Sequence, residues 1–556
     1  MRRYWLLAAW AVTQTAWAAP AIDAGSLLQQ IERDQRAPVL PAEDSGIAPQ
    51  QAPDSRSEQD QAIRFTVHRI TLLNVSVFSE DILLKMLSDI LEQSISLAEL
   101  KARTQRITDY YHAHGYPAAY AFLPEQTIGE DGNVEIRVLE GYLGELHLNN
   151  TSRLKEVAAK KRLPKMTAGD VLEQTPLERS TLLLNDIPGV MAQTAFNPGK
   201  DPGFTDVDIT LTDRPILSAQ LSADNQGNRY TGYGNRFMLH PEINNLTGYG
   251  EKLSANLLYG GFGMRYNQAQ FQLPTYWTGQ GRVGIEHSEI EYRLGREFAA
   301  SGSQGATRTN ALYANYPVIR SDAKNLTLEY RYQEKMVRDE VVSTGDTNQR
   351  GSFSHSYTAN GDWRDRAVNL WSLSYTQGRL DFNSPQHRAM DAASAKTLGY
   401  FSKINWNYTR LQGIPGSERT SLLLTLNGQL DPGRNLDPSE KMVLGGAHGV
   451  RAYPSSEAMS DKALLATIEL KHQLTPSTQA SVFYDYGNGT QNTSPWPAVK
   501  STNQTVIGGA GIGLRFRLGD SGYLFLQSAW RTLQTKPTSA NDKPGGRYWV
   551  EVGWGF

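Results

Sequence analysis

The pattern of hydrophobic and polar residues changes near residue 215. Beyond it, segment after segment of about ten residues alternates between apolar and polar positions. In residues 403–411, Ile404, Trp406 and Tyr408 occupy one face and polar residues occupy the other. Because side chains along a β-strand point alternately to its two faces, this pattern predicts strands that each have one apolar face.

Sixteen such segments follow one another to the C-terminus. We expect strands to begin near residues 216, 234, 250, 264, 281, 305, 324, 350, 367, 398, 418, 462, 478, 505, 521 and 546. The number is even, as it is in bacterial membrane barrels that are built from one chain. The last segment places Trp554 and Phe556 on its apolar face, and its terminal aromatic resembles the insertion signal of outer-membrane barrels.

Two architectures have strands of this kind. In a water-soluble sandwich the apolar faces form the core, whereas in a transmembrane barrel they face lipid and the polar faces line the lumen. Sixteen segments are more than one sandwich usually holds, and many carry Trp or Tyr near their ends, as an interfacial girdle requires. The sequence therefore predicts a mainly β protein whose residues 215–556 form a 16-stranded antiparallel transmembrane β-barrel.

The N-terminal residues predict a signal peptide, a helix and a linker. Residues 1–18 contain two arginines, a short apolar run and an Ala-Trp-Ala ending, which indicates a secretory signal; the run is too short for a membrane anchor. Residues 19–36 contain an amphipathic helix with Asp23 at its N-cap position. Its apolar side is formed by Leu27, Leu28 and Ile31. Residues 37–60 are proline-rich and polar, and they predict an extended linker.

Residues 61–140 and 141–214 repeat one order of elements, namely strand, helix, helix, strand, strand. In the first unit we expect strands at 65–73, 118–124 and 134–141 and helices at 79–91 and 96–115. In the second we expect strands at 142–150, 190–199 and 205–214 and helices at 152–163 and 175–189. The sequence thus predicts two small α+β domains ahead of the barrel.

Composition narrows the possible functions. The chain has 556 residues, no cysteine, 49 glycines and a formal net charge of −2, so neither disulfides nor a general attraction to nucleic acid is expected. No HExxH pair, GxSxG elbow or phosphate-binding glycine loop occurs. We therefore expect no catalytic residues, no metal site and no cofactor. The basic run in residues 155–165 could meet lipid headgroups or an acidic partner, although such runs are more often solvated helix faces.

Two motifs near the C-terminus carry chemistry. Residues 445–454, GGAHGVRAYP, lie in a long loop at 431–461, between the eleventh and twelfth predicted strands. In the thirteenth strand the apolar alternate positions should face lipid, so Asp485 should point into the lumen. If the loop folds inward, Arg451 could bind that carboxylate through two hydrogen bonds. Removing one partner of a water-shielded pair costs about 3–5 kcal/mol, whereas a surface pair contributes under about 1 kcal/mol.

Together these features resemble the outer-membrane transporters of two-partner secretion. These transporters belong to a superfamily that also contains barrel-assembly proteins. The loop motif of this family, Val-Arg-Gly-Tyr or Phe, is matched by Val450, Arg451, Ala452 and Tyr453, and its strand motif, Phe-x-Asp-x-Gly, by Phe483, Asp485 and Gly487. Ala452 departs from the family pattern. This position should therefore not need a positive φ angle.

The resemblance implies a location and a mechanism. The two α+β units would be POTRA domains in the periplasm of a Gram-negative bacterium. They would bind the N-terminal secretion domain of a large exoprotein such as an adhesin, a haemolysin or a contact-dependent toxin. An edge strand at Tyr120, Phe122 and Leu123 is the expected contact, through added backbone hydrogen bonds. The helix in 19–36 and the long loop would close the resting barrel.

The same resemblance implies two further partners, outer-membrane lipid and the barrel-assembly machinery that inserts the barrel. Two other functions stay open from the sequence. An insertion factor of the superfamily usually carries more periplasmic repeats, and a passive porin needs neither these units nor an arginine-bearing loop. The alternating strands, the repeats and the two motifs favour export of a partner exoprotein.

Overall fold

The computed structural model describes residues 23–35, 64–129, 131–232, 234–430, 433–497, 503–538 and 546–556. The predicted signal peptide at 1–18 and the predicted linker at 37–60 lie outside these residues. Within the described ranges, no helix is long and apolar enough to cross a membrane.

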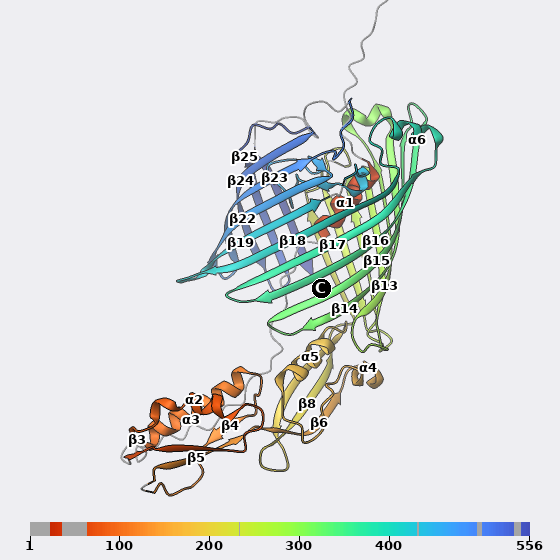
Figure 1. The fold of residues 1–556 in the computed structure, drawn as a ribbon. Helices are drawn as coiled ribbons and strands as arrows, with labels where there is room; N and C mark the ends of the chain where they lie inside the picture. The colour runs from red at the N-terminus through yellow and green to blue at the C-terminus, as the bar shows by residue number, and fades with distance from the viewer. Residues whose placement is uncertain are drawn as a thin grey trace, which may run out of the picture.

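A closed antiparallel barrel of sixteen strands forms the C-terminal part of the protein (Figure 1). Its strands are β9 (Leu217–Asp224), β10 (Arg236–Asn244), β11 (Lys252–Tyr259), β12 (Met264–Pro274), β13 (Arg282–Arg293), β14 (Ser303–Arg320), β15 (Lys324–Val341), β16 (Asp346–Arg364), β17 (Ala367–Phe382), β18 (Gly399–Ile414), β19 (Ser417–Leu430), β22 (Lys462–Thr475), β23 (Thr478–Thr490), β24 (Gln504–Leu518), β25 (Gly522–Arg531) and β26 (Arg547–Gly555). Each begins within four residues of its predicted start. The predicted fold class is confirmed.

The barrel closes where its first and last strands pair. β26 pairs with β9, and the main-chain N–H of Phe556 donates to the carbonyl oxygen of Ala219 at 2.8 Å. Closure satisfies the backbone groups that an open edge would expose to lipid. The outer face is apolar, with Leu373, Tyr484 and Phe556 exposed. Short helices lie in the loops between strands, namely η3 (Gly261–Gly263), η4 (Arg296–Ser301) and α6 (Pro385–Ala392).

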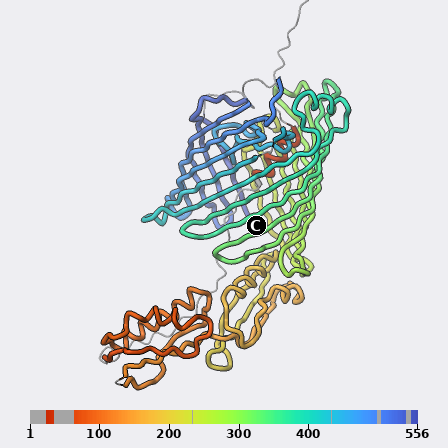
Figure 2. The backbone as a smooth tube through the Cα atoms, viewed as in Figure 1, coloured from red at the N-terminus to blue at the C-terminus, as the bar shows by residue number. Residues whose placement is uncertain are grey.

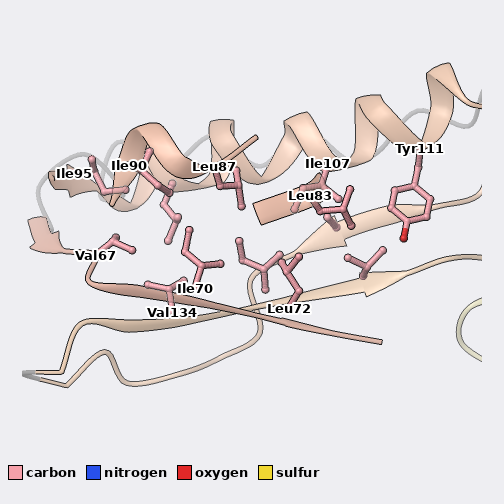
Figure 3. Packing of buried hydrophobic residues seen from close by; sticks show 14 of the residues in the cluster. Val67, Ile70, Leu72, Leu83, Leu87, Ile90, Ile95, Ile107, Tyr111 and Val134 are labelled. Atoms are coloured by element: carbon pink, nitrogen blue, oxygen red, sulfur yellow. The ribbon is translucent and has the colours of Figure 1, made fainter. Parts of the chain in front are cut away.

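The first α/β unit packs its helices on one face of a small sheet (Figure 1). Its elements are β1 (Arg64–Thr66), β2 (Arg69–Leu73), α2 (Glu80–Lys85), η2 (Ser88–Ile90), β3 (Ser94–Ser96), α3 (Leu97–Ala113), β4 (Tyr120–Phe122) and β5 (Asn133–Leu139). The sheet has the order β2-β5-β4, so β4 lies at an edge. Figure 3 shows the core, in which Leu83, Leu87 and Ile107 face Ile70 and Val134.

The first unit differs from its prediction in two places. The expected strand at 65–73 is interrupted, because the main chain of Val67 bonds to Gln93 and Glu92 and β1 pairs separately with β3. The expected helix at 79–91 begins after Ser79 but divides into α2 and a 3-10 turn. α3 begins as predicted, with a capping box between Ser96 and Glu99.

The second α/β unit lies directly against one end of the barrel (Figures 1 and 2). It comprises β6 (Tyr142–Asn150), α4 (Glu156–Lys160), α5 (Gln174–Asn185), β7 (Val190–Pro198) and β8 (Phe204–Asp213), with the sheet order β6-β8-β7. α4 is much shorter than the predicted helix at 152–163. Nε and Nη2 of Arg320 on the barrel each donate to the carboxylate of Asp186 at 2.9 Å, which joins the unit to the barrel rim.

The N-terminal helix α1 (Ala24–Gln35) lies inside the barrel (Figure 1). Its side chains Leu27, Leu28 and Ile31 are at most 2% exposed and belong to one cluster with Tyr266 and Ile290 of the wall. The carboxylate of Asp23 accepts a hydrogen bond from the N–H of Ser26 at 2.7 Å, as an N-cap residue does. The helix therefore fills part of the lumen with its apolar side against the wall.

We expect Glu140→Gln to weaken the first unit. The Glu140 carboxylate is buried and accepts hydrogen bonds from Ser76, from the N–H of Val77 at 2.8 Å and from the Tyr111 hydroxyl at 2.9 Å. Loss of the charge should lower the free energy of opening at residues 76 and 77 by about 1.5–3 kcal/mol, measured by hydrogen exchange on the whole chain.

The effect should depend on pH. Burial alone would raise the pKa of Glu140, but the hydrogen bonds from Ser76, Val77 and Tyr111 outweigh it and lower that pKa. The contribution is thus complete above the usual carboxyl pKa and is lost as pH falls through the lowered value. The exposed Glu125→Gln is the control, and equal opening in both variants would contradict the role of Glu140.

Candidate functional site in the barrel lumen

The loop at 431–461 folds into the lumen and packs there as an ordered unit. It contains η5 (Pro438–Glu440) and a short hairpin of β20 (Met442–Val443) and β21 (Met459–Ser460). Most of its described side chains are buried. At the tip, the N–H of Val450 donates to the Leu444 carbonyl at 2.8 Å, and a Cβ at Gly449 would lie 2.2 Å from that oxygen. Glycine is therefore required for this tight turn.

Arg451 lies at the tip of the loop and contacts the barrel wall. Its Nε and Nη2 donate to the two carboxylate oxygens of Asp485 on β23 at 2.9 and 2.8 Å, and its main-chain N–H donates to the same carboxylate at 3.1 Å. Asp485 is 0% exposed and Arg451 is 5% exposed. The pair is therefore shielded from water, so its hydrogen bonds are strong and loss of one partner is costly.

Two wall residues that the sequence did not indicate complete the arginine site. Glu469 on β22 accepts a hydrogen bond from Nη1 of Arg451 at 3.1 Å. The guanidinium carbon also lies 3.2 Å from the ring centroid of Phe483, which belongs to the predicted strand motif. Thr467, also on β22, donates to Asp485 at 2.9 Å. Since β22 pairs with β23 in register, Thr467 lies opposite Asp485 and Glu469 opposite Phe483. The sequence motifs do not reveal this strand register, so they could not identify Thr467 and Glu469 as parts of the site.

The main chain of Arg451 and the side chain of Tyr453 are also held by residues of the barrel. The indole N–H of Trp549 on β26 donates to the carbonyl oxygen of Arg451 at 2.9 Å. Tyr453 is fully buried and its hydroxyl donates to the Thr535 carbonyl at 2.8 Å. The loop tip therefore contacts strands β22 to β26 at several independent points.

Glycines on the wall make room for the tip. A Cβ at Gly509 would lie 2.5 Å from the Cβ of Ala452, and one at Gly487 would lie 3.1 Å from Val450. Ala452 is not among the residues with a positive φ angle, as the sequence led us to expect. The alanine side chain thus occupies the space above Gly509.

The same loop contacts the plug helix α1. Arg33 donates to the carbonyl oxygens of Val443 and Gly445 at 2.8 and 3.3 Å. Ser456 donates to the side chain of Gln30 at 2.9 Å. Gly25 lies so close to η5 that a Cβ would be 2.3 Å from that of Ser439. Helix and loop therefore pack as one body inside the barrel.

A second buried arginine links the helix, the loop and the wall. Arg350 on β16 pairs with Asp23 of the helix cap, with Asp339 on β15 at 2.8 Å and with Asp437 of the loop at 2.8 Å. Lys335 and Lys403 bind Glu440 of the loop at 2.7 and 2.8 Å. Buried charges on the wall thus also hold the part of the loop that precedes Arg451 in the chain. Within the described ranges, no group of three or more histidine, aspartate or glutamate side chains is arranged to hold a metal ion.

Comparison with known proteins agrees with this geometry. Residues 65–141 match the family described as POTRA domain, ShlB-type. Residues 203–516, more than half of the chain, match the family described as haemolysin secretion/activation protein ShlB/FhaC/HecB. The chain belongs to this ShlB/FhaC/HecB family.

Proteins that are similar to most of this chain are also named as transporters. The Heme/hemopexin transporter protein HuxB of Haemophilus influenzae is 29% identical over 89% of this chain and 88% of its own length. The Outer membrane transporter CdiB of Dickeya dadantii is 22% identical over 76% of this chain and 75% of its own.

Solved structures show the same fold. CdiB from Escherichia coli has a TM-score of 0.67 at 19% identity and covers 97% of this chain and 100% of its own. CdiB from Acinetobacter baumannii has a TM-score of 0.59 at 18% identity, covering 95% and 96%.

The protein is an outer-membrane transporter of two-partner secretion, with its POTRA domains in the periplasm and a secreted exoprotein as its partner. The barrel end beside the second POTRA domain is therefore periplasmic, and the loop at 431–461 enters the lumen from the extracellular end.

The remaining predicted site residues lie far from the lumen. Tyr120 and Phe122 occupy the edge strand β4 of the first POTRA domain, with their rings stacked 5.3 Å apart, and Leu123 follows them. Trp554 and Phe556 lie on the outer face of the barrel and are 39% and 78% exposed.

We expect Gly509→Ala to displace the loop tip of this transporter, because the new methyl group would overlap the Cβ of Ala452. Such overpacking costs about 1–3 kcal/mol. A second change, Ala452→Gly, should relieve the overlap. Loop displacement can be measured as protease cleavage of residues 445–454 in whole cells, and the double variant should return to the wild-type rate. Cleavage that is equally fast in the single and the double variant would contradict the contact.

Proposed function

We propose that this chain exports its exoprotein through a lumen that Arg451 keeps closed at rest by holding the loop at 431–461 inside the barrel. The supporting observation is the buried site of Arg451, Asp485 and Glu469, in which one guanidinium makes hydrogen bonds to two carboxylates. A passive porin gains nothing from so costly a burial of charge at a loop tip. A gated transporter needs a loop that stays in one place until the exoprotein arrives.

We propose that the first POTRA domain binds the N-terminal secretion domain of the exoprotein through strand β4. One side of β4 pairs with β5 and its other side lies at the sheet edge, where an extended segment can add hydrogen bonds. Tyr120 and Phe122 offer stacked rings beside that edge. No chemical catalysis is involved in this proposal; folding of the exoprotein outside the cell would prevent its return.

We propose a class of exoprotein on the support of the relatives. A protein named Heme/hemopexin transporter aligns over 89% of this chain at 29% identity, compared with 76% and 22% for the CdiB of Dickeya dadantii. This favours a haem-related exoprotein over a contact-dependent toxin. We also propose that residues 1–18 are a cleaved signal, that 37–60 are a linker, and that Trp554 and Phe556 direct insertion by the barrel-assembly machinery into outer-membrane lipid.

Export of the partner exoprotein provides the test. In Arg451→Ala the carboxylates of Asp485 and Glu469 lose their cation, at a cost of about 3–5 kcal/mol. The loop tip is then no longer held in one place before the exoprotein arrives, so export measured in culture medium should fall by more than about tenfold, the ratio that about 1.4 kcal/mol represents. Arg451→Lys keeps the charge but not the two-pronged contact, so its export should be intermediate.

The exposed Arg419→Ala, at the periplasmic end of β19, removes an arginine that lies away from the loop tip and is the control. Heat-modifiable migration in a gel should show that every variant barrel is inserted and folded. Wild-type export from folded Arg451→Ala would refute the proposed role of this residue.

Removing the plug helix should open the channel. Deletion of residues 22–36 leaves the barrel strands intact and removes the segment that fills the lumen beside β12 and β13. In planar bilayers we expect larger and steadier conductance than the full chain gives. Leu28→Asp should act in the same direction, since it places a carboxylate in an apolar contact. Unchanged conductance in both variants would mean that α1 does not block the channel.

A further inference from the structure

A cavity of about 840 Å³ lies where the second POTRA domain meets the periplasmic mouth of the barrel. One side is formed by the end of α5 and by β7, and the other by the periplasmic ends of β12 to β16. In Figures 1 and 2 these elements meet directly below the barrel wall. An exoprotein that passes from the POTRA domains to the lumen must cross this region.

The cavity faces the lumen and not the bilayer. Arg282 lies on the same face of β13 as Glu286, which pairs with Arg331 across the inner wall at 2.5 Å. The alternate residue Ile285 is 53% exposed on the outer, lipid-facing side. Asn315 and Thr327, which also line the cavity, add neutral hydrogen-bonding groups.

Positive charge predominates in the lining. Five arginines line the cavity, compared with three aspartates; they are Arg162, Arg214, Arg282, Arg320 and Arg364, against Asp186, Asp322 and Asp362. The carboxylate of Asp186 is committed to Arg320, at 2.9 Å for both oxygens. Within the described part of the chain, the lining therefore offers only two further carboxylates, those of Asp322 and Asp362, to the other four arginines.

Arg162 and Arg282 are two arginines of this lining that form no salt bridge with a carboxylate among the described residues. Arg162 is 6% exposed, and its Nη1 donates to the carbonyl oxygen of Ala158 at 3.0 Å. Arg282 donates to the main-chain carbonyl of Asp186. The sequence pattern predicted a solvated helix face for the basic run, which is wrong for Arg162.

These two guanidinium groups also repel each other. Burial lowers the pKa of Arg162, and the positive charge of Arg282 acts in the same direction. A buried cation without a carboxylate is costly, so the site as it stands favours an anion that would bind between the two groups. Carboxylates fit guanidinium groups well, since each oxygen can accept from a separate N–H.

The geometry points to an anion-binding site at the periplasmic mouth, in which Arg162 and Arg282 bind carboxylate side chains of an extended exoprotein segment entering the lumen. This inference rests on the proposed export function and deepens it. The site would select for acidic residues in the segment that enters the barrel and would hold them beside β7. The cavity lies on the lumen side, which favours a peptide carboxylate over a lipid phosphate.

A labelled hexaglutamate peptide provides a direct probe. The full chain in phosphatidylcholine nanodiscs should bind hexaglutamate, and hexaglutamine should bind at least about tenfold more weakly, as loss of one charge-assisted contact predicts. Arg162→Gln and Arg282→Gln should each weaken binding by about tenfold, measured by fluorescence anisotropy. Lys160→Gln is the matched control, because Lys160 is an exposed cation two residues from Arg162. It should bind like the wild type.

Several results would overturn the site. Equal affinity for hexaglutamate and hexaglutamine, or wild-type affinity in both arginine variants, would exclude it. Displacement of the peptide by added phosphatidylglycerol would assign the site to lipid headgroups. Arg282 lies on the barrel, so Arg282→Gln tests the site even if Arg162→Gln disturbs the POTRA domain.

Failure of the site and failure of the export proposal are distinguishable. Arginine-dependent peptide binding together with normal export from Arg451→Ala would refute the gating function and leave the site. The reverse pattern, with impaired export from Arg451→Ala and arginine-independent binding, would refute the site alone.

Discussion

One buried guanidinium fixes the tip of the loop that fills part of the lumen. Arg451 satisfies Asp485 and Glu469 together, and its backbone carbonyl is held in turn by Trp549. A barrel of sixteen strands leaves a wide interior that its own wall residues do not fill. The loop that fills it enters from one end and would leave again if its tip were not fixed. Two carboxylates on the wall become buried charges without a cation whenever the arginine departs, and this favours the inward position of the loop.

The plug helix depends on that loop. A helix of 12 residues is marginal in water, so α1 needs tertiary contacts to persist. Its apolar side meets the wall, while its polar side meets the loop through Arg33 and Gln30. Arg350 binds carboxylates of the helix, the wall and the loop at once. Movement of either the helix or the loop therefore breaks hydrogen bonds of the other, and the two are expected to leave the lumen together.

The sequence predicted the barrel closely because lipid imposes a period of two on every strand, and each strand start lies within four residues of its prediction. The alternation of side chains in β23 also placed the Asp485 carboxylate in the lumen, and this indicated Arg451 as its partner. Glu469 was missed because its role depends on strand register. The charge cluster of Arg350 was missed because it joins three segments that are distant in sequence. In the α/β units, short helices such as α4 were overestimated, since helical periodicity does not show where tertiary contacts end a helix.

The contact between α1 and the wall combines apolar burial with polar groups that have no hydrogen-bond partner among the described residues. Each of its buried leucines contributes roughly 1.5–3 kcal/mol of apolar burial. On β13 and β14, against which the helix packs, the hydroxyls of Ser288, Thr307 and Thr309 are buried without a hydrogen-bond partner in the described structure. Each such group costs about 1–3 kcal/mol, which offsets much of the apolar gain. An extended exoprotein in the same place would bring main-chain donors and acceptors that satisfy these hydroxyls.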